Sequence, residues 1–139
     1  MTAAPFDTKV AVVLREGLPV WQGLNVTAFL ATGIAGAHPE LIGEPYRDAS
    51  DVTYLPLLVQ PVLVFQAQAD QLATVLARAR TREVACAVYT EDMFATGHDA
   101  ANRATVRARP TEALPLVGLA LRAERKLADK LLKGLRLHP

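Results

Sequence analysis

Hydrophobic positions occur in short runs and in helical periods that alternate along the chain. Four apolar runs predict strands, at residues 9–15, 61–66, 84–90 and 114–122. Continuous apolar runs of this length are typical of strands buried on both faces of a sheet. Helical periods predict helices over residues 19–35, 70–82 and 123–137, with a weaker one over 100–108. Strand and helix therefore alternate over most of the chain.

The helix predicted over residues 19–35 is apolar almost all the way round. It begins at Pro19, since proline is tolerated in a first helical turn. A helix with so little polar surface needs cover on two sides. We expect the sheet on one side and another helix or a partner subunit on the other.

The segment after this helix, residues 36–53, is rich in glycine, proline and polar residues and predicts a long loop. Residues 54–59 predict an extended approach or an edge piece, because Pro56 and Pro61 each remove a ladder donor. The next helix has Asp70 as its predicted N-cap. Its buried stripe falls at helical spacing, on Leu72, Val75, Leu76 and Ala79.

Strands that alternate with helices predict a largely parallel, three-layer α/β/α domain. In such folds, ligands bind at the carboxyl ends of the strands. This rule selects residues 15–21, after the first strand, and residues 90–99, after the third.

The composition predicts one domain, residues 1–139, in a reducing compartment. A chain of 139 residues has the size of a single domain. Its one cysteine, Cys86, excludes an internal disulfide and lies within a predicted strand, where we expect an inert core thiol. The sequence shows neither a signal peptide nor an apolar stretch long enough for a membrane span. We therefore expect a cytoplasmic protein with no membrane partner.

Charge is unevenly spread, although the net charge is only +1. Residues 1–77 carry three basic and seven acidic side chains, a net of −4, whereas residues 78–139 carry twelve and seven, a net of +5. The basic half predicts either a surface that faces anions or nucleic acid, or cations that stabilise the carboxyl ends of helices.

The stretch VYTEDMFATGHDAANR, residues 88–103, places acids and a histidine directly after a predicted strand. His98 can donate or accept a proton, with Asp99 or Glu91 as the carboxylate that orients it. The alternative is structural, with Thr90 or Asp99 capping a turn or a helix.

A second polar group lies at the start of the first helix, in PVWQGLN. Gln22 and Asn25 share one helix face, and Trp21 is a neighbour of Asn25. A buried amide needs a hydrogen-bond partner, which can be the backbone, a ligand or the loop around His98. We expect Trp21, Gln22, Asn25 and Thr90 to contact a ligand.

Motifs for metals and nucleotides are absent from the sequence. The three histidines lie far apart and have no cysteine partner, so we predict no metal site. The sequence holds no P-loop or GxGxxG fingerprint, and we expect no cofactor. The basic helix at the C-terminus is either a phosphate contact or a solvated face.

Several segments together resemble an uncharacterised bacterial family. They are VAVVLREGLPVWQGLNVTAFLATGIAG, LIGEPY, YTEDMFATGHDAANR and DKLLKGLRLHP, and they resemble the DUF two-thousand family, named for a domain of unknown function. That family is similar in fold to peptidyl-tRNA hydrolase II. The resemblance implies a mixed four-stranded sheet with its last strand antiparallel, and it implies hydrolysis of tRNA esters. The hydrolase has lysines at the start of its first helix, where this chain has Pro19, Gln22 and Leu24.

Our leading interpretation is a protein of peptidyl-tRNA hydrolase II-like fold that binds a small-molecule or peptide-like ligand between the first helix and the loop after the third strand. Asn25 would orient the ligand, and His98 would exchange a proton with Asp99 or Glu91 as its partner. Two alternatives stay open. One is a hydrolase of aminoacyl or peptidyl esters of tRNA, and the other is an interaction protein whose first helix forms a homodimer interface.

Overall fold

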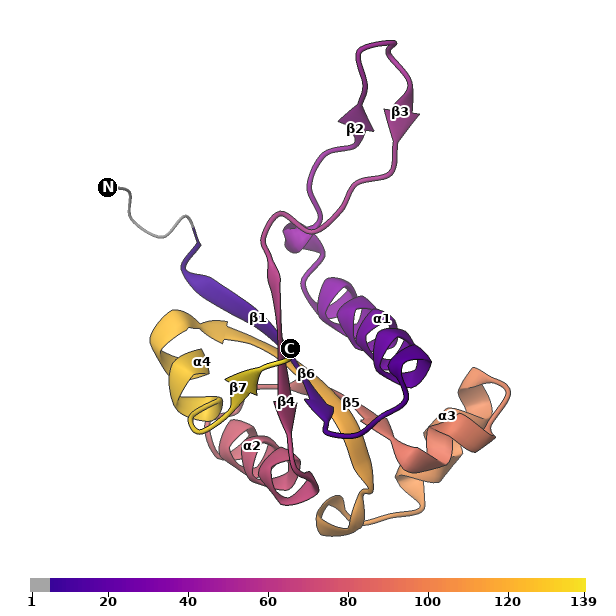
Figure 1. The fold of residues 1–139 in the computed structure, drawn as a ribbon, viewed down its shortest axis with the longest axis vertical. Coiled ribbons are helices and arrows are strands. Elements are labelled where there is room, and N and C mark those ends of the chain that lie inside the picture. The colour runs from indigo at the N-terminus through magenta and orange to yellow at the C-terminus, as the bar shows by residue number, and fades with distance from the viewer. Residues whose placement is uncertain (1–5) are drawn as a thin grey trace.

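The computed structural model describes residues 6–139, in which five strands form one mixed sheet (Figure 1). β1 and β4 are parallel, and the other three neighbouring pairs are antiparallel. In the spatial order β5-β6-β1-β4-β7, the strands are β5 (Cys86–Thr90), β6 (Leu116–Glu124), β1 (Thr8–Arg15), β4 (Val62–Ala67) and β7 (Arg136–Leu137).

The expected mixed sheet is confirmed, but the expected number of four strands is wrong. β1, β4 and β5 run in one direction, and β6, the last of the four predicted strands, lies between β5 and β1 and runs antiparallel to both, as the family resemblance implied. An apolar run marks a buried strand but carries no information on its direction. The fifth strand, β7, has two residues, too few to give a periodic pattern. The four longer strands lie within about two residues of their predicted positions.

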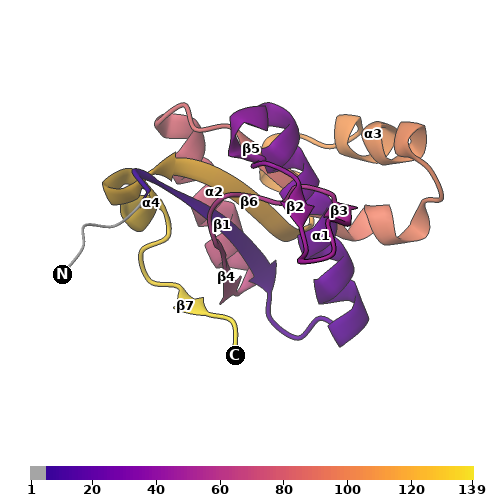
Figure 2. The ribbon, with the colours of Figure 1, turned by 90° about the horizontal axis from the view of Figure 1, so that it is seen from above.

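Helices cover both faces of the sheet, which gives three layers (Figure 2). α1 (Val20–Ala37) packs on one face, and α2 (Ala69–Thr81) and α4 (Arg125–Leu131) pack on the other. Alternate residues of β1 point into the two cores, with Val12 toward α1 and Val13 toward α2 and α4.

α1 has one covered side rather than the two expected. Val26, Leu30 and Ile34 are buried against the sheet. On the outer side, within residues 6–139, no second element covers the helix, and Val20 and Leu24 are 79% and 68% exposed. Of the two covers expected for this side, a second helix is not found among residues 6–139, and a partner subunit stays a prediction.

The predicted loop of residues 36–53 is a short 3-10 helix followed by a projecting hairpin. The 3-10 helix η1 spans Pro39–Leu41, and the hairpin pairs β2 (Tyr46–Arg47) with β3 (Thr53–Tyr54). Two backbone hydrogen bonds close its base, from Gly43 N–H to Leu57 O and from Val59 N–H to Leu41 O. We call residues 43–59 the arm, which rises from the body beyond the C-terminal end of α1 (Figure 1).

Two helix ends differ from prediction. α2 begins with a capping box between Gln68 and Gln71, and Asp70 lies in its first turn rather than at the cap. The C-terminal helix is shorter than predicted, because Gly134 adopts a φ of 91° that breaks the helix and turns the chain into β7. The predicted α2 stripe, from Leu72 to Ala79, is buried as expected.

The segment after β5 forms a 3-10 helix, η2 (Glu91–Ala95), and then α3 (Asp99–Arg107). A further 3-10 helix, η3 (Thr111–Ala113), leads into β6. No helix within residues 6–139 combines the length and the apolar character that crossing a bilayer requires.

Candidate functional site

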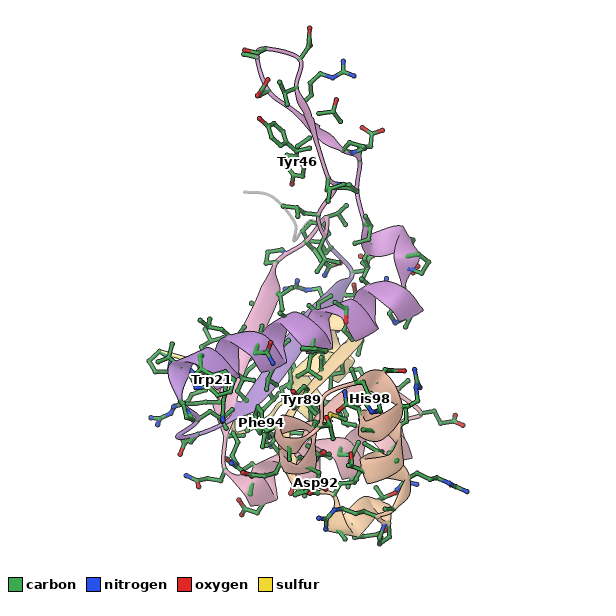
Figure 3. The ribbon with its side chains drawn as sticks, turned by 90° about the vertical axis from the view of Figure 1, so that its right-hand side faces the viewer. Trp21, Tyr46, Tyr89, Asp92, Phe94 and His98 are labelled. Atoms are coloured by element: carbon green, nitrogen blue, oxygen red, sulfur yellow. The ribbon has the colours of Figure 1, made fainter. Side chains whose placement is uncertain are left out.

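Four aromatic rings join α1 to the end of β5 and to η2. Trp21 meets Phe94 edge to face at 6.3 Å between ring centroids, Phe94 lies 5.3 Å from Tyr89, and Tyr89 meets Phe29 edge to face at 5.7 Å. Figure 3 shows Trp21 at one end of α1 and Tyr89 and Phe94 beneath the helix. Such ring pairs contribute beyond their buried area, so the cluster fixes η2 against α1.

A cleft of about 780 Å³ opens beside this cluster, between α1, β5 and α3. Its apolar wall comes from Phe29 and Leu30 on α1, Val88 and Tyr89 on β5, and Met93 on η2. The predicted location, between the first helix and the segment after the third strand, therefore holds a cleft.

α3 forms the opposite wall because it stands off the sheet. None of its residues is fully buried. Within the helix, Asp99 pairs with Arg103 at 2.8 Å. Beyond the end of the helix, a two-bond pair between Arg109 and Asp92 ties the chain to η2. This pair raises the pKa of Arg109, first through the hydrogen bond and then through the carboxylate charge.

The rim of the cleft on the α3 side is polar and carries a net positive charge. Asn102, Arg103 and Arg107 line it together with Asp99. Asp99 is paired with Arg103, whereas Arg107 has no carboxylate within 4 Å among residues 6–139. An anionic group of a ligand would find its partner at Arg107.

The three predicted catalytic residues do not come together. The ring of His98 caps α3, since its Nδ1 accepts the Ala101 N–H at 3.2 Å. Glu91 pairs with Arg15 at 2.6 Å, and Asp99 pairs with Arg103. Over the part of the chain that the structure describes, no hydrogen bond joins His98 to either carboxylate. A helix cap was predicted here, but by Thr90 or Asp99 rather than by His98.

The predicted binding residues lie around the aromatic cluster and beneath it. Trp21 belongs to the cluster, and Asn25 shares the α1 flank of Trp21 and Phe29 at a spacing of four residues. Asn25 and Gln22 are half-buried, and neither side chain has a hydrogen-bond partner among residues 6–139. Thr90 is 1% exposed, and its hydroxyl has no partner there either.

Of the predicted residues, Asp99 alone lines the cleft. The sequence reasoning missed Tyr89, Met93, Asn102, Arg103 and Arg107. Tyr89 lies in a strand and Met93 in a short 3-10 helix, so from the sequence both are expected to be core residues. Arg103 and Arg107 are four residues apart and so share one face of α3, which is a signal that the helical spacing of 100–108 contained.

A second cavity, of about 550 Å³, lies at the carboxyl end of β1 and beside Val64 of β4. The loop from Gly17 to Pro19 and the first turns of α1 line it, and His138 closes it on the β7 side. Strand ends were expected to hold a site, and residues 15–21 frame this one.

The described residues provide neither a cluster of metal ligands nor a reactive thiol. Within residues 6–139, no three His, Cys, Asp or Glu side chains gather closely enough to hold a metal ion. Burial raises the pKa of the Cys86 thiol to about 11, so the thiol stays protonated at neutral pH and is a poor nucleophile.

Comparisons with known proteins found one family model and a similar solved structure, both described as being of unknown function. The sequence model of a family described as "Protein of unknown function (DUF2000)" matches residues 8–139. A solved structure of a protein of unknown function, Atu0240 from Agrobacterium tumefaciens strain C58, is 48% identical, with a TM-score of 0.94 over 96% of this chain and 99% of that one. No curated protein matches the sequence.

Proposed function

Because the chain belongs to the DUF2000 family of proteins of unknown function, we propose from its geometry that it binds a small-molecule or peptide-like carboxylate in the cleft between α1, β5 and α3. The observation that carries this proposal is the cleft itself, which joins an apolar wall to an unpaired arginine.

The size and lining of the cleft support a ligand of small-molecule or short-peptide size. Binding sites for such ligands are typically 300–1,000 Å³, mostly apolar, and fitted with a few polar groups that fix orientation. The cleft has about 780 Å³, with the aromatic rings of Phe29 and Tyr89 on one side. These rings would pack on an apolar or aromatic part of the ligand.

The charge of the rim supports an anion. Arg107 is available at the mouth, and the Asn102 side chain also lines the cleft. A guanidinium binds a carboxylate through two parallel hydrogen bonds. An apolar group in the cleft and a carboxylate at the rim together describe an apolar acid or a short peptide with a free carboxyl end.

Binding is a better proposal than ester hydrolysis. The His98 ring is engaged in capping α3 through Nδ1, and both Glu91 and Asp99 are engaged by arginines. A general base must reach the proton it removes, with its orienting partner in place, and these groups point to other partners. The fold likeness to peptidyl-tRNA hydrolase II and a cytoplasmic location also remain proposals, the latter supported by the single unpaired thiol.

Calorimetry with defined acids tests the proposal. Indole-3-acetate, decanoate and N-acetyl-leucyl-phenylalanine serve as probes, each with its neutral amide as the matched compound. We expect at least one acid to bind more tightly than its amide, and Arg107→Gln to weaken it about tenfold by removing a charged hydrogen-bond donor. Arg80→Gln, on the exposed end of α2, is the control. If all acids fail to bind, or if both variants behave alike, the cleft is not an acid site.

The outer side of α1 supports a second proposal, that two copies associate through this helix. The 18 residues of α1 contain no charged side chain, and Val20, Trp21 and Leu24 are exposed along it. Contiguous exposed apolar surface of this kind marks association sites.

A further inference from the structure

We propose that the arm of one copy docks on the N-terminal half of α1 in a second copy and covers the cavity at the carboxyl end of β1. This inference rests on the proposed homodimer and names the segment that makes the contact. In such a dimer, the arm of each copy covers the cavity of the other copy.

The arm presents an apolar surface that its own chain leaves in water. The exposed large apolar side chains between Gly43 and Gln60 are Tyr46, Val52, Tyr54, Leu55, Leu57 and Val59. Leu55 is the most exposed of them, at 84%. Tyr46 stands far from the labelled residues of the body in Figure 3.

The arm also lacks the support that a hairpin normally needs. β2 and β3 share two residue pairs, and all four residues are exposed. Isolated two-stranded hairpins are marginally stable in water and gain stability by packing on a further layer. A surface on another molecule would provide that layer.

The receiving surface is the N-terminal half of α1 and the cavity beside it. Val20 and Leu24 are exposed and also line the cavity of about 550 Å³. The cavity is open on this side, and Thr27 and Ala28 continue its wall one turn further along α1. Leu55 and Leu57 of the arm are large and apolar, and the wall that Val20 and Leu24 give the cavity is apolar too.

Symmetry brings the two surfaces together. Two α1 helices that meet across a two-fold axis perpendicular to them are antiparallel. The arm leaves the body beyond the C-terminal end of α1 (Figure 1), so in such a pair it lies beside the N-terminal half of the partner's helix. Within one chain this contact is out of reach, because α1, with 18 residues, is about 27 Å long and the arm extends away from it.

The exposed apolar surface is of the size that an interface needs. The exposed apolar side chains of the arm and of α1 offer on the order of 1,000 Å² per chain for burial, compared with about 800 Å² buried per partner in a standard interface. The charges also agree. The arm carries Glu44, Asp48 and Asp51 against Arg47, and α1 begins without a side-chain cap or an acidic first turn, so its positive end favours an acidic neighbour.

Sedimentation velocity on point variants is the first test. Leu55→Glu on the arm and Leu24→Glu on α1 place a charge where the side chain is already exposed in one copy, so the fold of the single chain, followed by circular dichroism, should be unchanged. We expect a dimer at tens of micromolar for the unaltered protein and for the control Ser50→Glu, and monomers for both leucine variants. A monomeric unaltered protein would overturn the homodimer and this inference together.

Cross-linking separates the arm contact from a dimer made by α1 alone. Leu55→Cys and Leu24→Cys are prepared separately, each with Cys86→Ala, then mixed and oxidised with copper phenanthroline. The inference expects a disulfide between the two variants in the mixture and little in either variant alone. A stable dimer that gives only Leu24→Cys homodimers, and that survives Leu55→Glu, would overturn the arm contact and leave the homodimer standing.

Discussion

Thr90 combines nearly complete burial with a hydroxyl that has no partner among residues 6–139. A buried hydroxyl without a hydrogen bond destabilises the folded state, because its interaction with water is lost and not replaced. We predict that Thr90→Val, which keeps the shape and removes the polar atom, raises the free energy of unfolding by about 1 kcal/mol in urea titrations.

Thr90→Ala is the control, since it removes the hydroxyl and also leaves a small void. It should be less stable than Thr90→Val, by about 1 kcal/mol. If Thr90→Val is as unstable as Thr90→Ala, the hydroxyl has a partner in the folded protein. A loss of acid binding in Thr90→Val would restore the sequence prediction that this residue contacts a ligand.

Substitutions at His98 can distinguish a helix-capping role from a catalytic role for this side chain. Its Nδ1 accepts the Ala101 N–H at the start of α3, and an asparagine can accept the same bond. We predict that His98→Ala destabilises α3 by about 1 kcal/mol, read as faster hydrogen exchange at its amides, and that His98→Asn restores most of it. A turnover or binding effect that asparagine fails to restore would show proton chemistry at His98 instead.

At the scale of elements, hydrophobic periodicity predicted the longer helices and strands and missed the two-residue strands. The stripe of α2 and the apolar run of β1 were correct because several residues carry each signal. β7 has two residues, and the hairpin of the arm has two pairs, so neither provides a period. The long C-terminal helix was overextended because Leu135 continues the leucine spacing past Gly134, whose positive φ ends it.

Asp48 builds the tip of the arm. Its Oδ1 accepts the N–H groups of Ser50 and Val52 at 2.8 and 3.1 Å, and its Oδ2 accepts the Tyr54 hydroxyl at 2.9 Å. The Tyr54 hydrogen bond, followed by the two backbone bonds, lowers the pKa of Asp48 below its usual value of 3.8. A carboxyl group with a lowered pKa in the folded arm stabilises the folded arm above its unfolded pKa, and that contribution is lost as the pH falls through the folded pKa.

We therefore predict that the arm keeps its structure at neutral pH and loosens below pH 3.8. NMR chemical shifts of the Ser50 and Val52 amides, followed between neutral and acidic pH, measure the change. Asp48→Asn should show the loosened shifts at neutral pH, because the charge is gone. Asp51→Asn, which leaves these three hydrogen bonds intact, is the control. Amide shifts that stay constant in Asp48→Asn would contradict the prediction.

At the scale of the molecule, the site could be located from the sequence but its members could not. Strand order and the rule on carboxyl ends led to residues 15–21 and 90–99, and both segments border cavities. Which side chains face a cavity depends on the angle at which α3 leaves the sheet. The Asp92–Arg109 pair and the aromatic cluster hold the segments on either side of the cleft, and both join residues that are distant in sequence.

The contact of α1 with β6 at Gly118 determines the position of the helix over the sheet. A Cβ added at Gly118 would lie 2.8 Å from Cγ1 of Val26, 3.1 Å from Cδ1 of Leu30 and 3.3 Å from the carbonyl oxygen of Val13. Two of these neighbours are buried α1 side chains and the third is backbone. We predict that Gly118→Ala lowers the free energy of unfolding by about 1–3 kcal/mol, the usual cost of overpacking.

Gly36 provides the matched control, because it lies in α1 itself and a Cβ there meets nothing within 4 Å. Gly36→Ala should stabilise the protein by up to about 1 kcal/mol, since alanine loses less backbone freedom in a helix. The same chemical change then has opposite signs at the two positions in thermal or urea unfolding. Since α1 lines both cavities and carries the exposed apolar side, Gly118→Ala should also weaken acid binding and dimer formation, whereas Gly36→Ala should leave both unchanged. Equal effects of the two substitutions would mean that α1 does not depend on close approach to β6.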